Sequence, residues 1–367
     1  MTRPLVRKVA GFNLELACKP DFERAMQRID AWWQGEVLDR APVRFSAHNA
    51  FVSEKHGQGS WATVKDKWFD AEFQVAVFLE SIEGRILRAE TFPVFWPNIG
   101  PNYFASLYGC ELRFDEVTSW ALPCIHDWSD LGRLKLDLES VYHRKVEELT
   151  QVALRESPGK FMVGYTDFHP GLDCVAAWRD TRALLLDLYE HPEEVKAALE
   201  VATRDFRAVY DGFHRLLRAH GQPSVTWMGI PSFGRMHIPS CDVSAMISPE
   251  HFEEFFLPAL EREVKGMDHN VFHVDGKGVA RHLDAILEIP EIQAVQWVQG
   301  LNDDKPILQW VPLIRRFQEA GRSAVVELEV SELDAFMAEV PREGLLLCIA
   351  ADDADQEAIL ARVARWG

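Results

Sequence analysis

The chain has 367 residues, of which 47% are hydrophobic, so it can bury a large core, and barrels of alternating strands and helices reach this size as one domain. A formal net charge of −18 at pH 7, with no run of Lys or Arg to offset it, argues against binding to nucleic acid or to anionic membranes. The six cysteines are scattered, and we find neither a secretory leader nor an apolar stretch of about 20 residues. We therefore expect a soluble cytoplasmic protein with reduced thiols.

Apolar segments of strand length alternate with helical segments along the chain. A first helix is expected over residues 21–33, where apolar residues recur at helical spacing before Gly35. A first strand ends at Ser46, and further strands are expected at residues 91–96, 161–166, 224–229, 270–276, 292–297, 323–328 and 344–349. Helices are expected over residues 61–87, 134–155, 173–188, 193–219, 248–264 and 355–366, with a small hairpin strand at 111–117 and a further helix ending at Gly321.

This pattern predicts the fold class. Eight strands alternating with helices are typical of an α/β protein of the (β/α)8 TIM-barrel type, here with an N-terminal helical extension and a single domain over residues 1–367. A doubly wound open sheet would usually carry a Gly-rich phosphate loop after its first strand, and this sequence has none.

The active site of such a barrel lies at the C-terminal ends of its strands. Residues 270–276 end with His273 and Asp275, which point to the same side because strand residues two apart share a face. The pair could bind a metal or share a proton with a substrate, or Asp275 could simply cap the next helix. Cys348, at the end of the last strand, could complete a zinc site with one open position, although a buried cysteine is also an ordinary core residue.

Further polar residues follow the third and fourth expected strands. Asp167 and His169 could transfer protons, or they could satisfy backbone amides of their loop. His237 could handle protons and polar substrate groups, and Asp242 could act as an acid-base residue. Arg235 could anchor a substrate carboxylate or phosphate, or it could form an ion pair with Asp242.

Aromatic residues at the strand ends suggest a binding pocket. Three tryptophans could form a pocket for a flat or quaternary-ammonium group, or they could fill the core: Trp96, Trp227 and Trp297. Asn98 lies in a turn-rich loop after the second strand that suits a pocket wall, and His48 and Asn49 directly follow the first strand.

Two segments resemble the uroporphyrinogen decarboxylase superfamily, more specifically its corrinoid-dependent methyltransferase branch. Residues 38–43, Leu-Asp-Arg-Ala-Pro-Val, resemble the family's approach to its first strand. Residues 242–258, from Asp242 through Ser248-Pro249-Glu250 to Pro258, are similar to a second family segment. The likeness covers most of the chain, is best over residues 242–297, and implies a (β/α)8 barrel.

The resemblance also implies a metal site. In that branch a His-x-Cys pair and a distal Cys hold the zinc that activates a thiol acceptor for methylation by a methyl-corrinoid. His273 matches the family's His and Cys348 matches the distal Cys, whereas Asp275 stands in place of the first Cys. A carboxylate is a harder ligand, which makes the zinc more electrophilic. Residues 44–51 lack the arginine-rich segment of true uroporphyrinogen decarboxylases, which argues against a porphyrinogen substrate.

We therefore expect a methyltransferase-type enzyme that moves a methyl group between a small substrate and a corrinoid (cobalamin) cofactor on a partner protein. Zinc would be bound at the C-terminal face of the barrel, and barrels of this type often form homodimers. The alternative is a metal-independent lyase of the decarboxylase kind, or a hydrolase, that uses strand-end acid-base residues such as Asp167, His169, Asp242 and Glu327. A third class, a barrel that binds a ligand without turnover, also fits the sequence.

Overall fold

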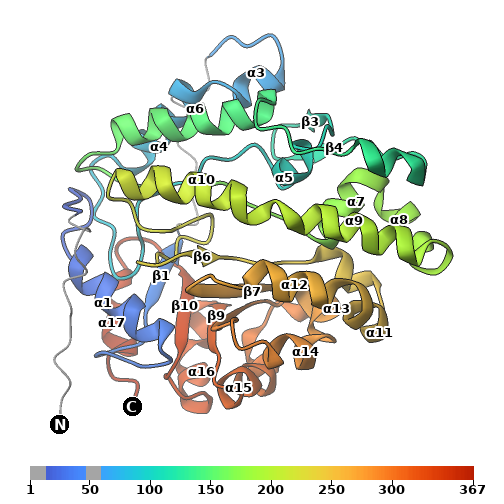
Figure 1. Ribbon diagram of the computed structural model, residues 1–367. Helices are drawn as coiled ribbons and strands as arrows, with labels where there is room; N and C mark the ends of the chain where they lie inside the picture. Colours follow the sequence, from blue (N-terminus) through green and yellow to red (C-terminus); the bar gives the residue numbers. More distant parts are fainter. Residues whose placement is uncertain (1–13, 47–58) are drawn as a thin grey trace.

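The computed structural model describes residues 14–46 and 59–367 of the chain (Figure 1). Its central element is a curled sheet of six strands in which every neighbouring pair is parallel. In spatial order the strands are β1 (Val43–Ser46), β10 (Leu345–Ala350), β9 (Ser323–Leu328), β8 (Ala294–Val298), β7 (His269–Asp275) and β6 (Met236–His237).

Two smaller sheets accompany it. The short strands β2 (Val94–Phe95) and β5 (Met162–Val163) pair in parallel, and β3 (Leu112–Phe114) pairs with β4 (Ser119–Ala121) as an antiparallel hairpin. The Glu90 amide donates to the Val43 carbonyl at 2.9 Å, so the segment before β2 lies beside β1. The structure is thus a TIM-like α/β fold, but across the described residues the expected ladder of eight strands does not close into a barrel.

The fourth expected strand is the main departure from the prediction. Residues 224–229 make one antiparallel bridge, from Ser224 to Ser232, and then turn at Gly229, whose φ is +68°. The chain therefore returns toward the N-terminal end of the sheet before it runs forward again as β6. A short apolar segment of this kind reads as a strand, but the turn that follows makes it one arm of a loop.

Helices surround the curled sheet on its outer side. In Figure 1, α6, α9 and α10 lie on one side and α14, α15 and α16 on the other. The helices are α1 (Phe22–Trp33), α3 (Val64–Trp68), α4 (Ala71–Ile82), α5 (Tyr103–Ser106), α6 (Val141–Glu156), α7 (Leu172–Arg179), α8 (Thr181–Glu190), α9 (Pro192–Arg204), α10 (Phe206–Ala219), α11 (Pro249–His251), α12 (Leu257–Val264), α13 (Gly276–Ala280), α14 (Leu283–Glu288), α15 (Val311–Glu319), α16 (Leu333–Glu339) and α17 (Gln356–Val363). In the described part of the chain, none of these helices combines the length and the apolar character needed to cross a membrane.

Alternate residues of the strands pack into two separate cores, because successive side chains of a strand point to opposite faces. On the inner, concave face, Val271 of β7 packs in a cluster with Val325 and Leu346, whereas its neighbour Phe272 belongs to the larger outer cluster beneath the helices. Helix α1 covers the start of β7, because the Trp33 ring stacks on His269 with centroids 4.3 Å apart. At the opposite end, where the strands stop, Asp242 and Asp275 are exposed.

Candidate active site

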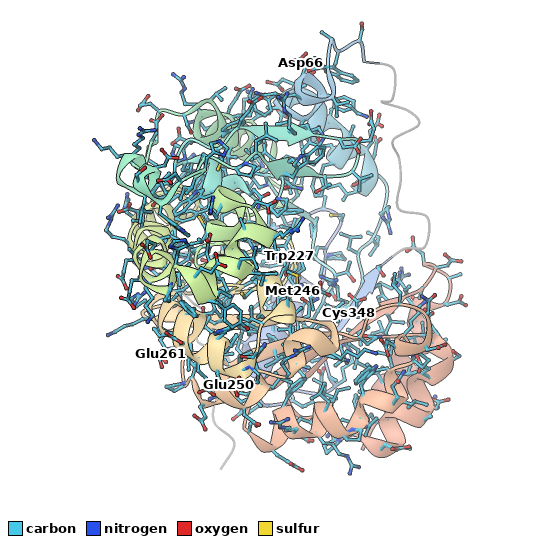
Figure 2. All side chains as sticks on the ribbon, turned by 90° about the vertical axis from the view of Figure 1, so that its right-hand side faces the viewer. Asp66, Trp227, Met246, Glu250, Glu261 and Cys348 are labelled. Atoms are coloured by element: carbon cyan, nitrogen blue, oxygen red, sulfur yellow. The ribbon has the colours of Figure 1, made fainter. Side chains whose placement is uncertain are left out.

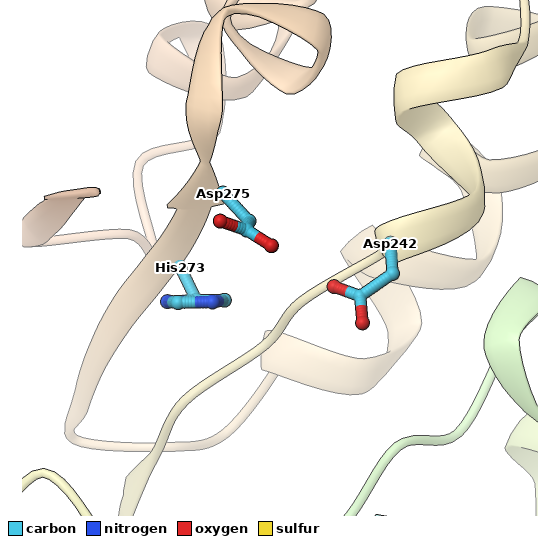
Figure 3. Close-up of side chains that lie close together, drawn as sticks. All are labelled: Asp242, His273 and Asp275. Atoms are coloured by element: carbon cyan, nitrogen blue, oxygen red, sulfur yellow. The ribbon is translucent and has the colours of Figure 1, made fainter. Parts of the chain in front are cut away.

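Three metal-competent side chains meet where β7 ends (Figure 3). One ligand atom from each of Asp242, His273 and Asp275 lies within 4.8 Å of the others. His273 and Asp275 project from the same face of β7, and Asp242 begins the facing 3-10 turn Asp242–Met246. Asp275 occupies the N-cap position of α13, but its side chain makes no capping hydrogen bond to a described residue. Its carboxylate is therefore free for another partner.

The path of the chain after β6 brings Asp242 to this place. Strand β6 runs parallel to β7, and the pairing continues with a bridge between Ser240 and His273. The next residues deliver Asp242 to the C-terminal end of β7. The buried side of this turn is held by the Asp173 carboxylate of α7, which accepts the Asp242 amide at 2.9 Å and the Val243 amide at 3.1 Å.

A neighbouring strand fixes the orientation of the His273 ring. Gln296 of β8 lies opposite His273 in the ladder, is 3% exposed, and accepts from the His273 Nδ1–H at 2.7 Å. With the proton on Nδ1, the Nε2 lone pair is available to a ligand. The Trp227 ring stands edge-on to the imidazole, with centroids 5.4 Å apart, and forms one wall of the site.

Cys348 lies outside this group of three. It sits on β10, separated from β7 by β9 and β8, and it packs in the inner apolar cluster with 6% exposure. Burial raises the pKa of its thiol, although the nearby Arg44 guanidinium works in the opposite direction. Among the described residues, the third member of the cluster is Asp242, which the sequence had suggested for acid-base work or for an ion pair with Arg235, and not as a metal ligand. In Figure 2, Cys348 and Trp227 are both labelled near the middle of the molecule.

A second polar network adjoins the first. The His169 ring contacts Asp167 Oδ2 through Nε2 at 2.7 Å and Ser240 Oγ through Nδ1 at 2.8 Å. Burial lowers the pKa of His169, but Asp167 and then Asp173 and Asp242 outweigh it and raise the pKa to about 10. His169 is therefore an imidazolium at neutral pH and donates both hydrogen bonds.

Burial and the neighbouring carboxylates also shift the pKa of Asp173. Burial, together with the charge of Asp242, raises the pKa of the Asp173 carboxyl to about 6. The Asp173 Oδ2 atom lies 4.0 Å from Nδ1 of His169, so the two networks share this residue. Ser240, Asp173 and Gln296 were not identified from the sequence, since their roles follow from which segments lie side by side.

His237 does not reach this face. Because residues alternate along β6, Met236 faces the inner cluster and His237 points outward, where it is 1% exposed. Its Nε2 lies 2.6 Å from Oε1 of Glu263 on α12. Burial lowers the pKa of His237 to about 3 and raises that of Glu263 well above its ordinary value, so the Glu263 carboxyl donates to a neutral imidazole. The expected role of His237 with substrate is corrected to a buried structural contact.

Arg235 and Trp297 also differ from the prediction. The backbone of Arg235 pairs with Asp268, beside the start of β7, and its Nε donates to Asp211 at 3.1 Å. The arginine is thus at the N-terminal end of the sheet, where the chain has returned after Gly229. Trp297 is fully buried in the outer core, 4.8 Å from the Trp310 ring, because its neighbour Gln296 takes the inward position. Neither residue lines the site.

Of the other residues predicted to line a pocket, only some lie near the cluster. Trp96 is partly buried just after β2, and Trp227 contacts His273 as described. The Asn98 side chain accepts the Gly100 amide at 2.7 Å and so supports its own loop. His48 and Asn49 lie outside the described residues.

The protein has an α/β fold with a curled, TIM-like parallel sheet and a cluster of titratable side chains at the strand ends. Neither a protein-family model nor a curated protein sequence matches the chain. Among solved structures it is similar to a methyltransferase from Methanosarcina mazei, with a TM-score of 0.62 and 12% sequence identity over 93% of this chain and 98% of that chain. At this identity, the likeness shows a shared fold.

Proposed function

We propose that this protein is a methyltransferase-type enzyme that moves a methyl group between a small substrate and a corrinoid cofactor. The cluster of Asp242, His273 and Asp275 carries the proposal, because it brings an imidazole and two carboxylates together at the end of the sheet where barrels of this kind place their active sites. The likeness of the fold to a methyltransferase supports it. The corrinoid would be carried by a separate protein.

The residues present fit a divalent metal. His273 offers Nε2 because Gln296 holds the other ring nitrogen, and Asp242 and Asp275 each offer a carboxylate oxygen. Zinc held by three such ligands keeps an open position and lowers the pKa of a thiol or water bound there. Cys348 would then be a neighbour in the inner core and not a ligand. Two carboxylates also make the site harder than one built on thiolates.

The other residues of the site would position the substrate and manage charge. Trp227 provides an apolar wall against His273 for a small methyl donor or acceptor. The His169 imidazolium, hydrogen-bonded to Asp167 and Ser240, can give a proton to a polar substrate group. It also offsets part of the negative charge that the carboxylates concentrate.

A second candidate function rests on that network alone. The hydrogen-bonded chain of Asp167, His169 and Ser240 suits a metal-independent lyase or hydrolase. Because His169 is already protonated at neutral pH, it would act as a general acid and could not activate Ser240 as a base. This chemistry would not need Asp275.

Methyl transfer can be measured directly. Protein loaded with zinc is mixed with methylcobalamin and a panel of small thiols, and loss of the methyl-corrinoid is followed by its visible spectrum. We expect demethylation that requires protein, metal and thiol, and a loss of at least about tenfold for Asp275→Asn, because one ligand is weakened. Full activity of D275N would contradict the metal mechanism, and no demethylation by wild type would contradict the methyltransferase proposal and leave the second candidate.

A further inference from the structure

Two cysteines outside the proposed active site lie in contact at the base of the β3–β4 hairpin. Cys110 precedes β3 and Cys124 follows β4, so they flank the paired residues Leu112 and Ala121. Their Sγ atoms are 3.1 Å apart, and all six cysteines, each in the described part of the chain, are free thiols. Two thiols this close need little movement to be bridged.

The backbone of α7 holds the pair in place. The amides of Cys124 and Ile125 both donate to the Trp178 carbonyl at 2.8 Å, and the Cys110 Sγ lies 3.7 Å from the Ala177 carbonyl. Cys110 is 1% exposed, whereas Cys124 is only partly buried. A small reagent can therefore reach Cys124 first, and the buried Cys110 sulfur is in contact with it.

The contact also makes the two sulfurs differ in reactivity, because it shifts their pKa values in opposite directions. The Cys110 thiol donates to the Cys124 sulfur, which lowers the pKa of Cys124 and, with burial, raises that of Cys110. The thiolate is the nucleophilic form of a cysteine, so Cys124 is the attacking residue and Cys110 the resolving one. Burial keeps the third nearby thiol, Cys174, protonated by raising its pKa.

We propose that Cys110 and Cys124 form a redox-reactive dithiol, a modification site that a hydroperoxide such as hydrogen peroxide converts to a disulfide. The Cys124 thiolate attacks one peroxide oxygen, the O–O bond breaks, and the departing hydroxide takes a proton to leave as water, giving a sulfenic acid. The Cys110 sulfur then attacks the Cys124 sulfur, its proton goes to the departing oxygen, and a second water leaves. Two thiols are oxidised and one peroxide is reduced.

The new bond would close the base of the hairpin where it rests on α7. The opposite end of that helix carries Asp173, which holds the turn that bears Asp242. Oxidation would thus stiffen the layer that supports the cluster. The proposal concerns cysteine chemistry alone and stands whether or not the protein transfers methyl groups.

The test uses the full chain. The reduced protein is treated with hydrogen peroxide, the peroxide is removed with catalase, and the protein is denatured for a thiol count and for peptide mapping without reductant. We expect the count to fall by two, one cross-link between the peptides that contain Cys110 and Cys124, and full reversal by dithiothreitol. If mapping finds the two thiols still free, or joined to other cysteines, the proposal is wrong.

Variants separate the two roles. With Cys110→Ser, Cys124 should stop at the sulfenic acid, which dimedone traps, and with Cys124→Ser, Cys110 should stay reduced. Cys18→Ser is the matched control, since Cys18 is buried elsewhere and bonds to the Lys160 carbonyl, and it should behave as wild type. Dimedone labelling of Cys110 in C124S would overturn the assigned order of attack, and the wild-type map tests the pair even if a variant does not fold.

Discussion

The imidazole of His169 is surrounded by carboxylates, and this neighbourhood fixes its charge. Asp167 lies at 2.7 Å and Asp173 at 4.0 Å, and together with Asp242 they raise the pKa from an ordinary 6.5 to about 10 despite burial. We predict that this imidazole stays protonated at pH 8, which an NMR titration of its ring protons would show. Titration near pH 6.5 would contradict it.

The same shift has a consequence for stability. Because the pKa of His169 is higher in the folded protein, its favourable contribution is complete below about pH 6.5 and is lost as the pH rises toward 10. The free energy of unfolding of wild type should therefore fall over this range more steeply than that of His169→Gln. Urea denaturation at several pH values measures both, and parallel pH profiles would argue against the assigned charge.

A buried glutamine should tune the proposed metal site without touching the metal. Gln296→Leu removes the acceptor for His273 Nδ1–H, so we expect metal affinity to weaken by about 10–100-fold. Isothermal titration gives the dissociation constant. Gln356→Leu, a change at an equally buried glutamine on α17, is the control. Equal affinities for wild type and Q296L would mean that Gln296 does not position the ring.

For the residues of the site, the sequence was enough to predict contacts that depend on local spacing, but not contacts between segments far apart in the chain. The alternation of a strand was enough to indicate that His273 and Asp275 face one way. That Asp242 joins them, and that Gln296 lies opposite His273, depends on which strands are adjacent. The displacement of Arg235 to the other end of the sheet depends on one turn at Gly229.

Among the elements, the helix start at Ser248 illustrates a signal that is fully local. A serine before a proline predicts an N-cap, and the Ser248 Oγ accepts the His251 amide at 3.3 Å. Ser248→Ala should lower the free energy of unfolding by about 1 kcal/mol. Chemical denaturation measures this, with the exposed Ser331 as control. An S248A protein as stable as Ser331→Ala would show that the cap contributes little.

Element boundaries were less predictable where tertiary contacts decide them. The expected helix over 193–219 is divided at Asp205 into α9 and α10, and the expected helix over 134–155 begins only at Val141. The apolar segment at 224–229 has strand composition but lacks a continuous neighbour, so it makes a single bridge. Composition indicates which residues are buried and leaves open what they pair with.

In the molecule as a whole, the two ends of the sheet differ. Helix α1 packs against the N-terminal end of β7, and the proposed metal ligands lie at its C-terminal end. The alternation of strands and helices was enough to predict a TIM-like α/β fold, but not that six strands would form one ladder and two a separate pair. At the N-terminal end, Trp33 stacks on His269 and donates through Nε1 to the Pro231 carbonyl at 3.1 Å.

This division can be tested by a change far from the site. Trp33 is 6% exposed, so Trp33→Ala should cost about 3–5 kcal/mol of folding free energy, since it removes a large buried ring. Metal affinity should stay unchanged, because the proposed ligands lie at the opposite end. Denaturant titration and metal titration on the same sample check both. A folded W33A protein with weakened metal binding would show that the two ends are coupled.

Asp242, His273 and Asp275 form the proposed metal site, and calorimetric titration with zinc measures whether they bind the metal. We expect wild type and Cys348→Ser to bind one zinc per chain with similar affinity, and Asp242→Asn and Asp275→Asn to bind at least about tenfold more weakly. If wild type binds no zinc, or if binding is lost in C348S and kept in D242N, the site is not the one described.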